Sequence, residues 1–234
     1  MQYKDLMTDP YQTPSANPLN PEIPASSSDL DIPGLSNAQY PLKVSFKIIA
    51  IAPQLTITDA TGRSLIYVKQ KLFKFKEKVE IFSDNTKTTK LGTIQANKVI
   101  DWSARYFFGG PDGGEIGSVG RKGMRSLWKA SYETFNPGDD TPDYHITEEN
   151  PVAKIMDGLI GEIPVLGMAS SYLFHPKYAA TQHSDGEIVM RLTKKPALWE
   201  GKFELEKFAD LTPQQELNLL LSFTMMMLLE RARG

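Results

Sequence analysis

The three histidines of this sequence, His145, His175 and His183, have the side-chain chemistry best suited to acid–base catalysis or metal binding. They are separated by many residues, and no two of them show the HxH or HxxxH spacing that is typical of zinc ligands. His183 precedes Ser184 and Asp185, but the members of a catalytic triad converge from separate segments, so three consecutive residues do not form one. The histidines are therefore expected to stand alone, with no metal site and no triad.

Five acidic residues gather within a short stretch, and their side chains are the kind that bind calcium. They are Asp139, Asp140, Asp143, Glu148 and Glu149. Their spacing lacks the one-three-five pattern of oxygen ligands in a calcium-binding loop. The stretch begins within a predicted loop at residues 136–142, and the prediction is a single solvated acidic loop.

A glycine-rich run between Gly109 and Gly123 has the composition of a phosphate-binding loop. The GxxxxGK[S/T] pattern is missing, however, and the run leads into a strand pattern instead of the helix that such a loop requires. Tight hairpin turns explain these glycines, the first of them at residues 109–114. These patterns lead us to expect a protein that is not an enzyme and that uses no cofactor.

The strongest functional candidate in the sequence is a set of basic residues on two segments. The set comprises Lys69, Lys71, Lys74, Lys76 and Lys78, together with Arg121, Lys122, Arg125 and Lys129. Residues 63–129 hold 14 Lys and Arg against six Asp and Glu, although the whole chain has a formal net charge of −2. If the two segments are neighbouring strands, their outward side chains form a cationic groove.

Such a groove would suit an anionic lipid, since each Lys or Arg near a charged membrane contributes about 1 kcal/mol. A solvated strand exterior, balanced by acidic neighbours, is the alternative interpretation of the same residues. Nucleic acid is disfavoured as a partner because outward aromatic residues are sparse and the chain is slightly acidic.

The composition is that of an ordinary globular protein, with 234 residues, 41% of them hydrophobic and 23% charged. This length is enough to bury a substantial core. The lack of cysteine excludes disulfides and thiol chemistry, and the polar N-terminus does not resemble a secretory signal. We expect a cytoplasmic protein, either free or peripheral to a membrane.

Residues 1–40 differ in amino-acid composition from the rest of the chain. They contain six prolines and a run of three serines but few large apolar residues, so they cannot bury enough surface to offset the entropy of ordering. The prediction is an extended or disordered tail, with Leu35 and Tyr40 as its candidates for contact with a single domain at residues 41–234.

From Pro41 onward, β-branched and aromatic residues alternate with polar ones in short runs bounded by turn residues. The predicted strands are residues 44–51, 55–58, 63–70, 73–81, 90–96, 105–108, 115–121, 127–135, two or three between 165 and 178, then 187–193 and 202–208. Residues 152–156 have the pattern of a short helix. Ten to twelve short strands at this spacing predict an all-β barrel or sandwich.

The last segment, residues 213–233, has the pattern of a helix. Thr212 and Gln215 match a capping box, and Pro213 suits the first helical position. The run from Leu217 to Leu229 is apolar on every side of the helix, which requires burial in protein or lipid. At thirteen residues, interrupted by polar ones, it is shorter than the roughly 20 residues of a membrane span.

The expected fold is therefore mainly β, a closed antiparallel barrel of about twelve strands around a buried C-terminal helix. A closed barrel removes the exposed edges of the sheet and leaves a lumen that side chains must fill. Only the helix is apolar enough to fill it. Its polar residues Asn218, Ser222 and Thr224 must then find hydrogen-bond partners inside the barrel or lie near its mouth.

Four short motifs, in this order and followed by the helix, resemble those of a known superfamily. They are Asp-Ala-Thr-Gly-Arg-Ser-Leu-Ile-Tyr-Val at 59–68, the Lys-rich segment at 71–84, Gly-Glu-Ile-Gly-Ser-Val-Gly-Arg-Lys at 114–122, and Ala-Ser-Tyr-Glu-Thr-Phe at 130–135. The chain from about residue 44 to 233 resembles the tubby C-terminal-like superfamily, in particular its LURP-one-related and phospholipid scramblase-like branches.

This resemblance implies a twelve-stranded barrel around a central helix and a protein without enzymatic activity. Tubby-like proteins bind membrane phosphoinositides through basic residues, and scramblase-like proteins associate with membranes. The cysteine-rich and calcium-binding segments of the scramblase branch are missing here, and the tubby phosphoinositide residues have no clear counterpart, so no site is transferred.

The expected function is binding of an anionic lipid headgroup or membrane surface, or of another protein as a scaffold. The alternative is a small-ligand carrier or enzyme that uses a pocket at the barrel mouth.

Overall fold

The structure is a computed structural model of the 234-residue chain. It describes Ile32 and residues 34–47, 54–69, 78–96, 104–122, 131–149, 176–197 and 200–233, with the backbone alone for Glu200 and residues 231–233. The predicted tail up to residue 31, the predicted helix at 152–156 and the predicted strand residues 73–77 lie outside these ranges.

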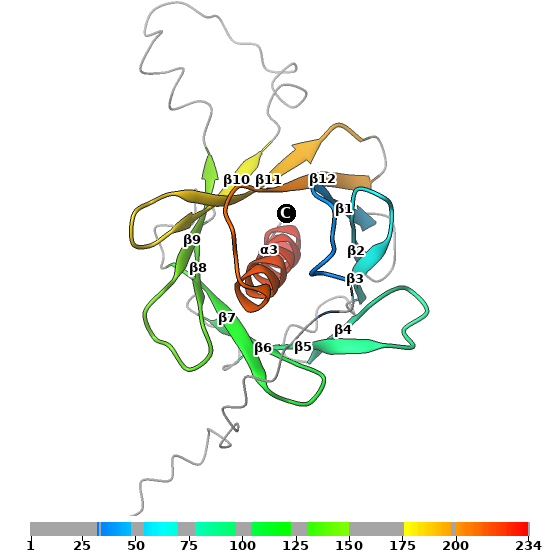
Figure 1. Cartoon of the computed structure of the whole chain (residues 1–234), viewed down its shortest axis with the longest axis horizontal. Coiled ribbons are helices and arrows are strands. Elements are labelled where there is room, and N and C mark those ends of the chain that lie inside the picture. The colour runs from blue at the N-terminus through cyan, green and yellow to red at the C-terminus, as the bar shows by residue number, and fades with distance from the viewer. Residues whose placement is uncertain are drawn as a thin grey trace, which may run out of the picture.

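Twelve antiparallel strands form a closed barrel (Figure 1). Each strand pairs with its neighbours in sequence, and β1 pairs with β12 to close the ring. The strands are β1 (Leu42–Lys47), β2 (Gln54–Thr58), β3 (Ser64–Lys69), β4 (Val79–Phe82), β5 (Lys90–Ala96), β6 (Arg105–Gly109), β7 (Glu115–Arg121), β8 (Ser131–Phe135), β9 (Tyr144–Glu149), β10 (Lys177–Gln182), β11 (Ile188–Lys195) and β12 (Glu200–Lys207). The predicted fold class is thus confirmed.

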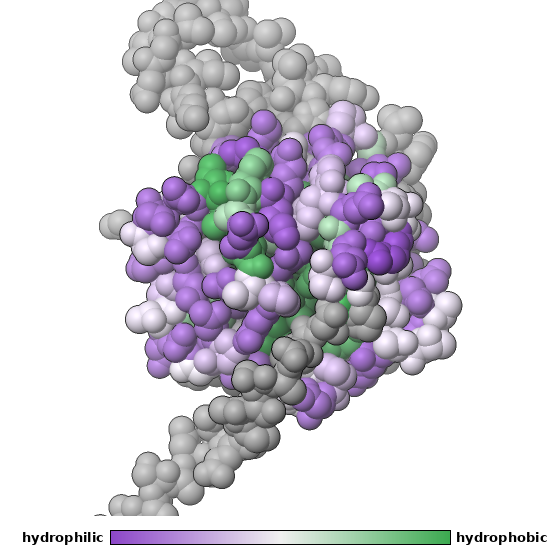
Figure 2. Space-filling model, in the orientation of Figure 1, coloured by the Kyte–Doolittle hydropathy of each residue, from purple (hydrophilic) through white to green (hydrophobic). Residues whose placement is uncertain are grey.

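Alternation of residue type along the strands separates the inside of the barrel from the outside. In β1, Leu42, Val44 and Phe46 are buried, whereas Lys43 and Lys47 are exposed. Successive side chains of a strand point to opposite faces of a sheet, so one pattern supplies both a core and a polar surface. On the face shown in Figure 2, hydrophilic residues cover most of the surface of the described barrel.

The helix α3 (Pro213–Arg233) runs through the barrel, as Figure 1 shows. It begins with the predicted capping box: the Gln215 amide donates to the Thr212 hydroxyl at 3.3 Å, and the Thr212 amide donates to the Gln215 side chain at 3.0 Å. All residues from Leu217 to Leu228 are buried. The apolar segment is therefore the core of the barrel, and within the described part of the chain no helix is long and apolar enough to cross a membrane.

The helix lies closest to β6, β7 and β8. Gly117 of β7 permits this approach, because a Cβ atom built there would lie 2.5 Å from the Asn218 side-chain nitrogen. Its φ of 152° also disfavours other residues. Asn218 in turn donates a 2.9 Å hydrogen bond to the Phe135 carbonyl of β8, so one glycine and one amide fix the helix against the wall.

The buried polar residues of the helix have only some of the hydrogen-bond partners that burial inside the barrel requires. Thr224 donates from its hydroxyl to the Leu220 carbonyl one turn earlier, at 2.8 Å. The Ser222 hydroxyl and the Asn218 side-chain oxygen are buried and have no hydrogen-bond partner among the described residues. The hydrogen-bonding groups of these buried helix side chains are thus only partly paired.

Two strands differ from the sequence prediction. β9 occupies residues 144–149, where a solvated acidic loop was expected, so that prediction is wrong for Glu148 and Glu149. The alternation of buried Tyr144 and Ile146 explains the strand, and the acidic composition concealed it. β10 extends to Gln182, although the predicted strands in this region ended at residue 178.

Candidate functional site

The predicted basic set is only partly visible in the described residues. Lys69 ends β3, Lys78 precedes β4, Arg121 ends β7, and Lys122 follows it. The remaining members, Lys71, Lys74, Lys76, Arg125 and Lys129, lie outside the described residues. Lys69, Lys78 and Lys122 are exposed.

The two basic segments do not lie on neighbouring strands, which contradicts the premise of a groove between adjacent strands, whereas the binding role of these residues stays a prediction. β5 and β6 separate β4 from β7 in the barrel. Because β3 and β7 run in the same direction, Lys69 and Arg121 share one end of the barrel, but three strands, β4, β5 and β6, lie between them. Lys122 forms a 2.8 Å ion pair with Glu133, which offsets its charge.

A different cationic surface lies on the outer wall of the barrel, across β2, β1, β12 and β11. It is a hollow of about 370 Å³, which we call the outer groove. Its lining residues are Lys43, Val44, Ser45, Thr56, Thr58, Lys195, Lys202, Phe203 and Glu204. The volume lies near the lower end of the roughly 300–1,000 Å³ that ligand sites occupy.

Strand register explains how these residues meet. Ser45 of β1 lies opposite Thr56 of β2 and Lys202 of β12, and Lys202 lies opposite Lys195 of β11. One step along the strands, Lys43 lies between Thr58 and Glu204. The short Ser45 side chain in the middle of this grid leaves a hollow between the long side chains around it.

The residues that line the outer groove carry three ammonium groups and one carboxylate, while the surface of the hollow itself is mostly apolar. Glu204 forms an ion pair with Lys195, and Lys43 donates to the Ala60 carbonyl at 3.4 Å. Lys195 and Lys202 lie directly opposite each other across the strand pair, an arrangement of like charges that destabilises a sheet. An anion bound between them would remove this repulsion.

Hydroxyl groups complete the chemistry of the outer groove. Ser45, Thr56 and Thr58 are partly exposed there, and Thr56 and Thr58 can donate hydrogen bonds beside the lysines. Ammonium and hydroxyl donors around one hollow suit a ligand with several negatively charged oxygens, because hydrogen bonds to charged acceptors are the stronger ones.

Sequence reasoning missed the outer groove because its parts come from opposite ends of the barrel sequence. Lys43 and Ser45 precede Lys195 and Lys202 by about 150 residues. Only the closure of the barrel through β1 and β12 brings them together. No window of the sequence contains enough of these residues to mark a site.

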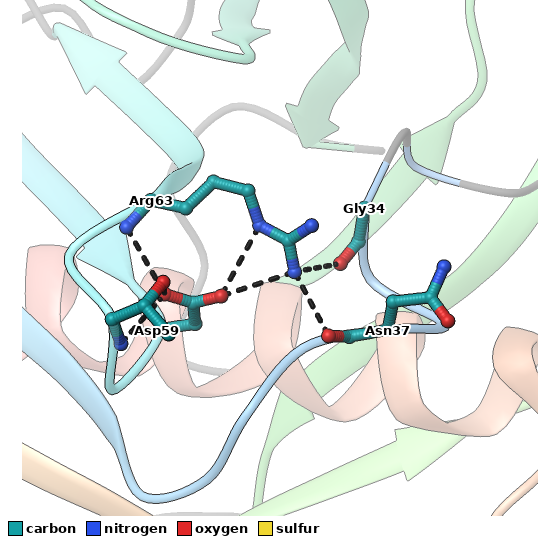
Figure 3. A network of polar contacts seen from close by, with 5 residues as sticks. Gly34, Asn37, Asp59 and Arg63 are labelled. Atoms are coloured by element: carbon teal, nitrogen blue, oxygen red, sulfur yellow. Dashed lines mark hydrogen bonds and ion pairs between the residues drawn. The ribbon is translucent and has the colours of Figure 1, made fainter.

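A second polar cluster, centred on Asp59, has a structural role (Figure 3). The Asp59 side chain is 1% exposed. One of its carboxylate oxygens accepts from the Thr61 hydroxyl at 2.6 Å and from the Arg63 amide at 3.0 Å. Arg63 also binds the Gly34 and Asn37 carbonyls. The hydrogen bond from Thr61 contributes most to lowering the pKa of Asp59, and the cluster fastens the segment before β1 to the β2–β3 turn.

A third cluster fixes the start of α3. Glu216, in the first turn, accepts from the Tyr40 hydroxyl at 2.7 Å and pairs with Lys207 at 2.8 Å. An acidic side chain in this position also offsets the helix dipole. Burial, followed by the contact with Glu216, raises the pKa of Tyr40. These bonds join the segment before β1, the end of β12 and the helix.

The structure corrects the expectation that each histidine stands alone. His145 of β9 and His183 of the β10–β11 turn meet, with 2.6 Å between the His145 Nε2 and His183 Nδ1 atoms. The antiparallel pairing of β9 and β10 produces this contact across 38 residues of sequence. His175 lies outside the described residues.

Comparisons with known proteins add little to this geometry. No family model matches the chain, and no curated protein matches it either. Among solved structures, the X-ray structure of a protein from Arabidopsis thaliana is similar, with 13% sequence identity and a TM-score of 0.44. The match covers 84% of this chain and 94% of the Arabidopsis chain. The fold described above rests on the strand pairing alone, and the resemblance to the tubby C-terminal-like superfamily stays a prediction.

Proposed function

We propose that this barrel is a non-enzymatic binding protein that recognises an anionic lipid headgroup at a membrane surface through the outer groove. The observation that supports it is the convergence of Lys43, Lys195 and Lys202 with three hydroxyl groups around one hollow. Glu204 is the one carboxylate among the lining residues, so the groove has a formal charge of +2.

The position of the outer groove on the outside of the barrel favours a ligand that is part of a membrane surface. The polar side chains of the groove stand on the outside of the barrel wall, where Lys43 and Lys202 are exposed, whereas the Val44 side chain is buried. A bilayer can therefore approach the groove from outside. Each lysine near an anionic membrane contributes about 1 kcal/mol, so three of them give a measurable preference for charged vesicles.

The filled lumen argues against the alternative of a carrier or enzyme that uses a pocket at the barrel mouth. Leu219, Leu220 and Phe223 of α3 occupy the interior and are at most 2% exposed. The Tyr40, Lys207 and Glu216 cluster holds the start of the helix in place. A ligand would have to displace packed side chains to enter there.

Vesicle co-sedimentation with the full chain tests the proposal. Neutral phosphatidylcholine vesicles are compared with the same vesicles containing a phosphoinositide. The groove variant Lys43→Glu/Lys202→Glu is compared with Lys69→Glu/Lys78→Glu, which makes the same change of charge at two exposed lysines of the predicted basic set.

We expect the wild-type protein and the Lys69/Lys78 variant to sediment with anionic vesicles, and the groove variant to stay in solution. Salt should weaken the binding, because exposed charges are screened over about 10 Å at 0.1 M ionic strength. Equal sedimentation with neutral and anionic vesicles would refute lipid recognition. Loss of binding in the Lys69/Lys78 variant alone would move the site to the predicted basic set.

A further inference from the structure

The pair formed by His145 and His183 is unusual for two residues on a barrel surface. Their facing nitrogens are 2.6 Å apart, and their ring centroids are 4.8 Å apart with a tilt of 59° between the planes. At this distance one nitrogen must carry the shared hydrogen and the other must present a lone pair. If the hydrogen is removed, two lone pairs converge on one point.

Glu133 of β8 supports one imidazole from the other side. Its carboxylate lies 3.6 Å from Nδ1 of His145, the nitrogen that faces away from His183. A carboxylate in this position favours a hydrogen on Nδ1 and leaves Nε2 free as an acceptor. In metal sites, a carboxylate that is hydrogen-bonded behind a histidine ligand orients it and fixes its tautomer. Here the 3.6 Å separation is longer than a hydrogen bond, so the carboxylate acts through its charge.

We propose that His145 and His183 bind a divalent transition-metal ion such as Zn²⁺ through Nε2 and Nδ1 respectively. Two zinc–nitrogen bonds of about 2.0–2.1 Å at a tetrahedral angle place the nitrogens about 3.3 Å apart. His183 is exposed in a turn, so a small rotation of its side chain supplies the extra separation.

The site supplies two protein ligands, and water completes the coordination. Among the described residues no group of three or more His, Cys, Asp and Glu side chains surrounds a common metal position. Lys122 pairs at 2.8 Å with the same Glu133 oxygen that lies nearest Nδ1 of His145. Since the sequence has no cysteine, no thiolate competes for the metal.

Metal binding here would join β9 to the β10–β11 turn. His145 belongs to the strand and His183 to the turn, and the His183 amide already donates to the Asp143 carbonyl at 2.8 Å. A ligand that binds the folded state alone stabilises it in proportion to its concentration. Zinc should therefore raise the melting temperature of the protein as well as bind to it.

Isothermal titration with Zn²⁺ of the full chain, free of any histidine tag, tests this site. The variants are His145→Gln, His183→Gln and Glu133→Gln, with His175→Gln as the matched control for the third histidine. Melting curves with and without Zn²⁺ provide the second readout and show whether each variant folds. His183→Gln is the safer variant, because His183 is exposed.

We expect one zinc ion per chain, loss of binding in both His145→Gln and His183→Gln, and unchanged binding in His175→Gln. Glu133→Gln should weaken binding by about 10- to 100-fold. Absence of saturable binding to the wild type, unchanged binding in folded His183→Gln, or loss of binding in His175→Gln would each overturn the proposal. Ca²⁺ and Mg²⁺, which prefer oxygen ligands, should not bind in the same assay.

Discussion

The inner and outer faces of β1 and β12 are formed by alternate residues of the same two strands and have opposite properties. Leu42 and Leu205 face each other across the strand pair inside the barrel, and both are fully buried. Their neighbours Lys43 and Glu204 also face each other, but on the outside, where they line the outer groove. The inner face should therefore control stability, and the outer face should control binding.

The largest expected effect comes from placing a charge in the interior. Phe223→Asp puts a carboxylate at a position of α3 that is 2% exposed and removes a buried aromatic ring. Loss of the ring alone costs about 3–5 kcal/mol, and an unpaired buried charge adds to that cost. Because net stability is about 5–15 kcal/mol, we expect no cooperative unfolding transition in circular dichroism.

Phe208→Asp is the matched control, since it makes the same exchange at a phenylalanine that is 52% exposed. It loses only a contact with Arg191, whose guanidinium lies 5.1 Å from the ring centroid. We expect a change of about 1 kcal/mol or less. A Phe223→Asp variant that melts cooperatively near the wild-type temperature would show that the helix does not fill the barrel.

The next largest effect concerns the close approach of the helix to β7. Gly117→Ala forces a Cβ atom against the Asn218 side chain, which is itself tied to the Phe135 carbonyl. Overpacking of this kind costs about 1–3 kcal/mol, in addition to the strain of the positive φ. Urea unfolding measures the loss of stability.

Gly113→Ala separates the clash from the strain. Gly113 also has a positive φ, of 91°, but nothing lies within 4 Å of the Cβ position. Strain alone costs about 1–2 kcal/mol. If the two variants lose the same stability, the helix is not packed against Gly117 as described.

A smaller, pH-dependent effect is expected from Asp59→Asn. The folded protein lowers the pKa of Asp59, mainly through the hydrogen bond from Thr61. The stability from the charged form is therefore complete above the unfolded pKa of about 3.9 and is lost as pH falls through the lower folded value. The variant should be less stable than the wild type at pH 7, and the difference should shrink below about pH 4.

Urea midpoints of both proteins between pH 7 and pH 3 check this sign. Glu80 and Asp84 also have lowered pKa values, but both proteins retain them, so their contribution cancels in the difference. A difference that stays constant over this range would mean that the charge of Asp59 does not stabilise the turn.

The smallest expected effect on stability belongs to the outer groove. Lys43→Glu/Lys202→Glu changes two exposed residues that make no buried contact, so the free energy of unfolding should change by about 0.5 kcal/mol or less per site. The same variant is expected to lose vesicle binding. A large fall in melting temperature would show that the outer lysines stabilise the fold. It would contradict the claim that the inner face controls stability and the outer face controls binding.

Features that depend on local periodicity could be predicted from the sequence. The capping box at Thr212 and the all-round apolar helix are readable because their residues are adjacent along the chain. β9 was missed because it ends in Glu148 and Glu149 and follows an acidic loop, which concealed the alternation of Tyr144 and Ile146. The barrel could nevertheless be predicted, because missing one strand does not change the period-two alternation of the other strands.

Features that depend on which distant segments pair in the barrel could not be predicted. The outer groove joins β1 and β2 to β11 and β12, and the histidine pair joins β9 to a turn 38 residues later. Neither arrangement leaves a spacing signal in the sequence. The expectation that the two basic segments lie on neighbouring strands was wrong because β5 and β6 separate β4 from β7, and the binding role of the basic set stays a prediction.

The most direct test of the account is a titration of the ¹⁵N-labelled full chain with a soluble inositol phosphate headgroup, followed by NMR. We predict saturable shifts confined to the outer groove, at Lys43, Ser45 and Thr56 on one side and at Lys195 and Lys202 on the other. Shifts centred on residues 69–78 and 121–125, or the lack of any saturable shift, would contradict the claim that the outer wall binds the anionic ligand there.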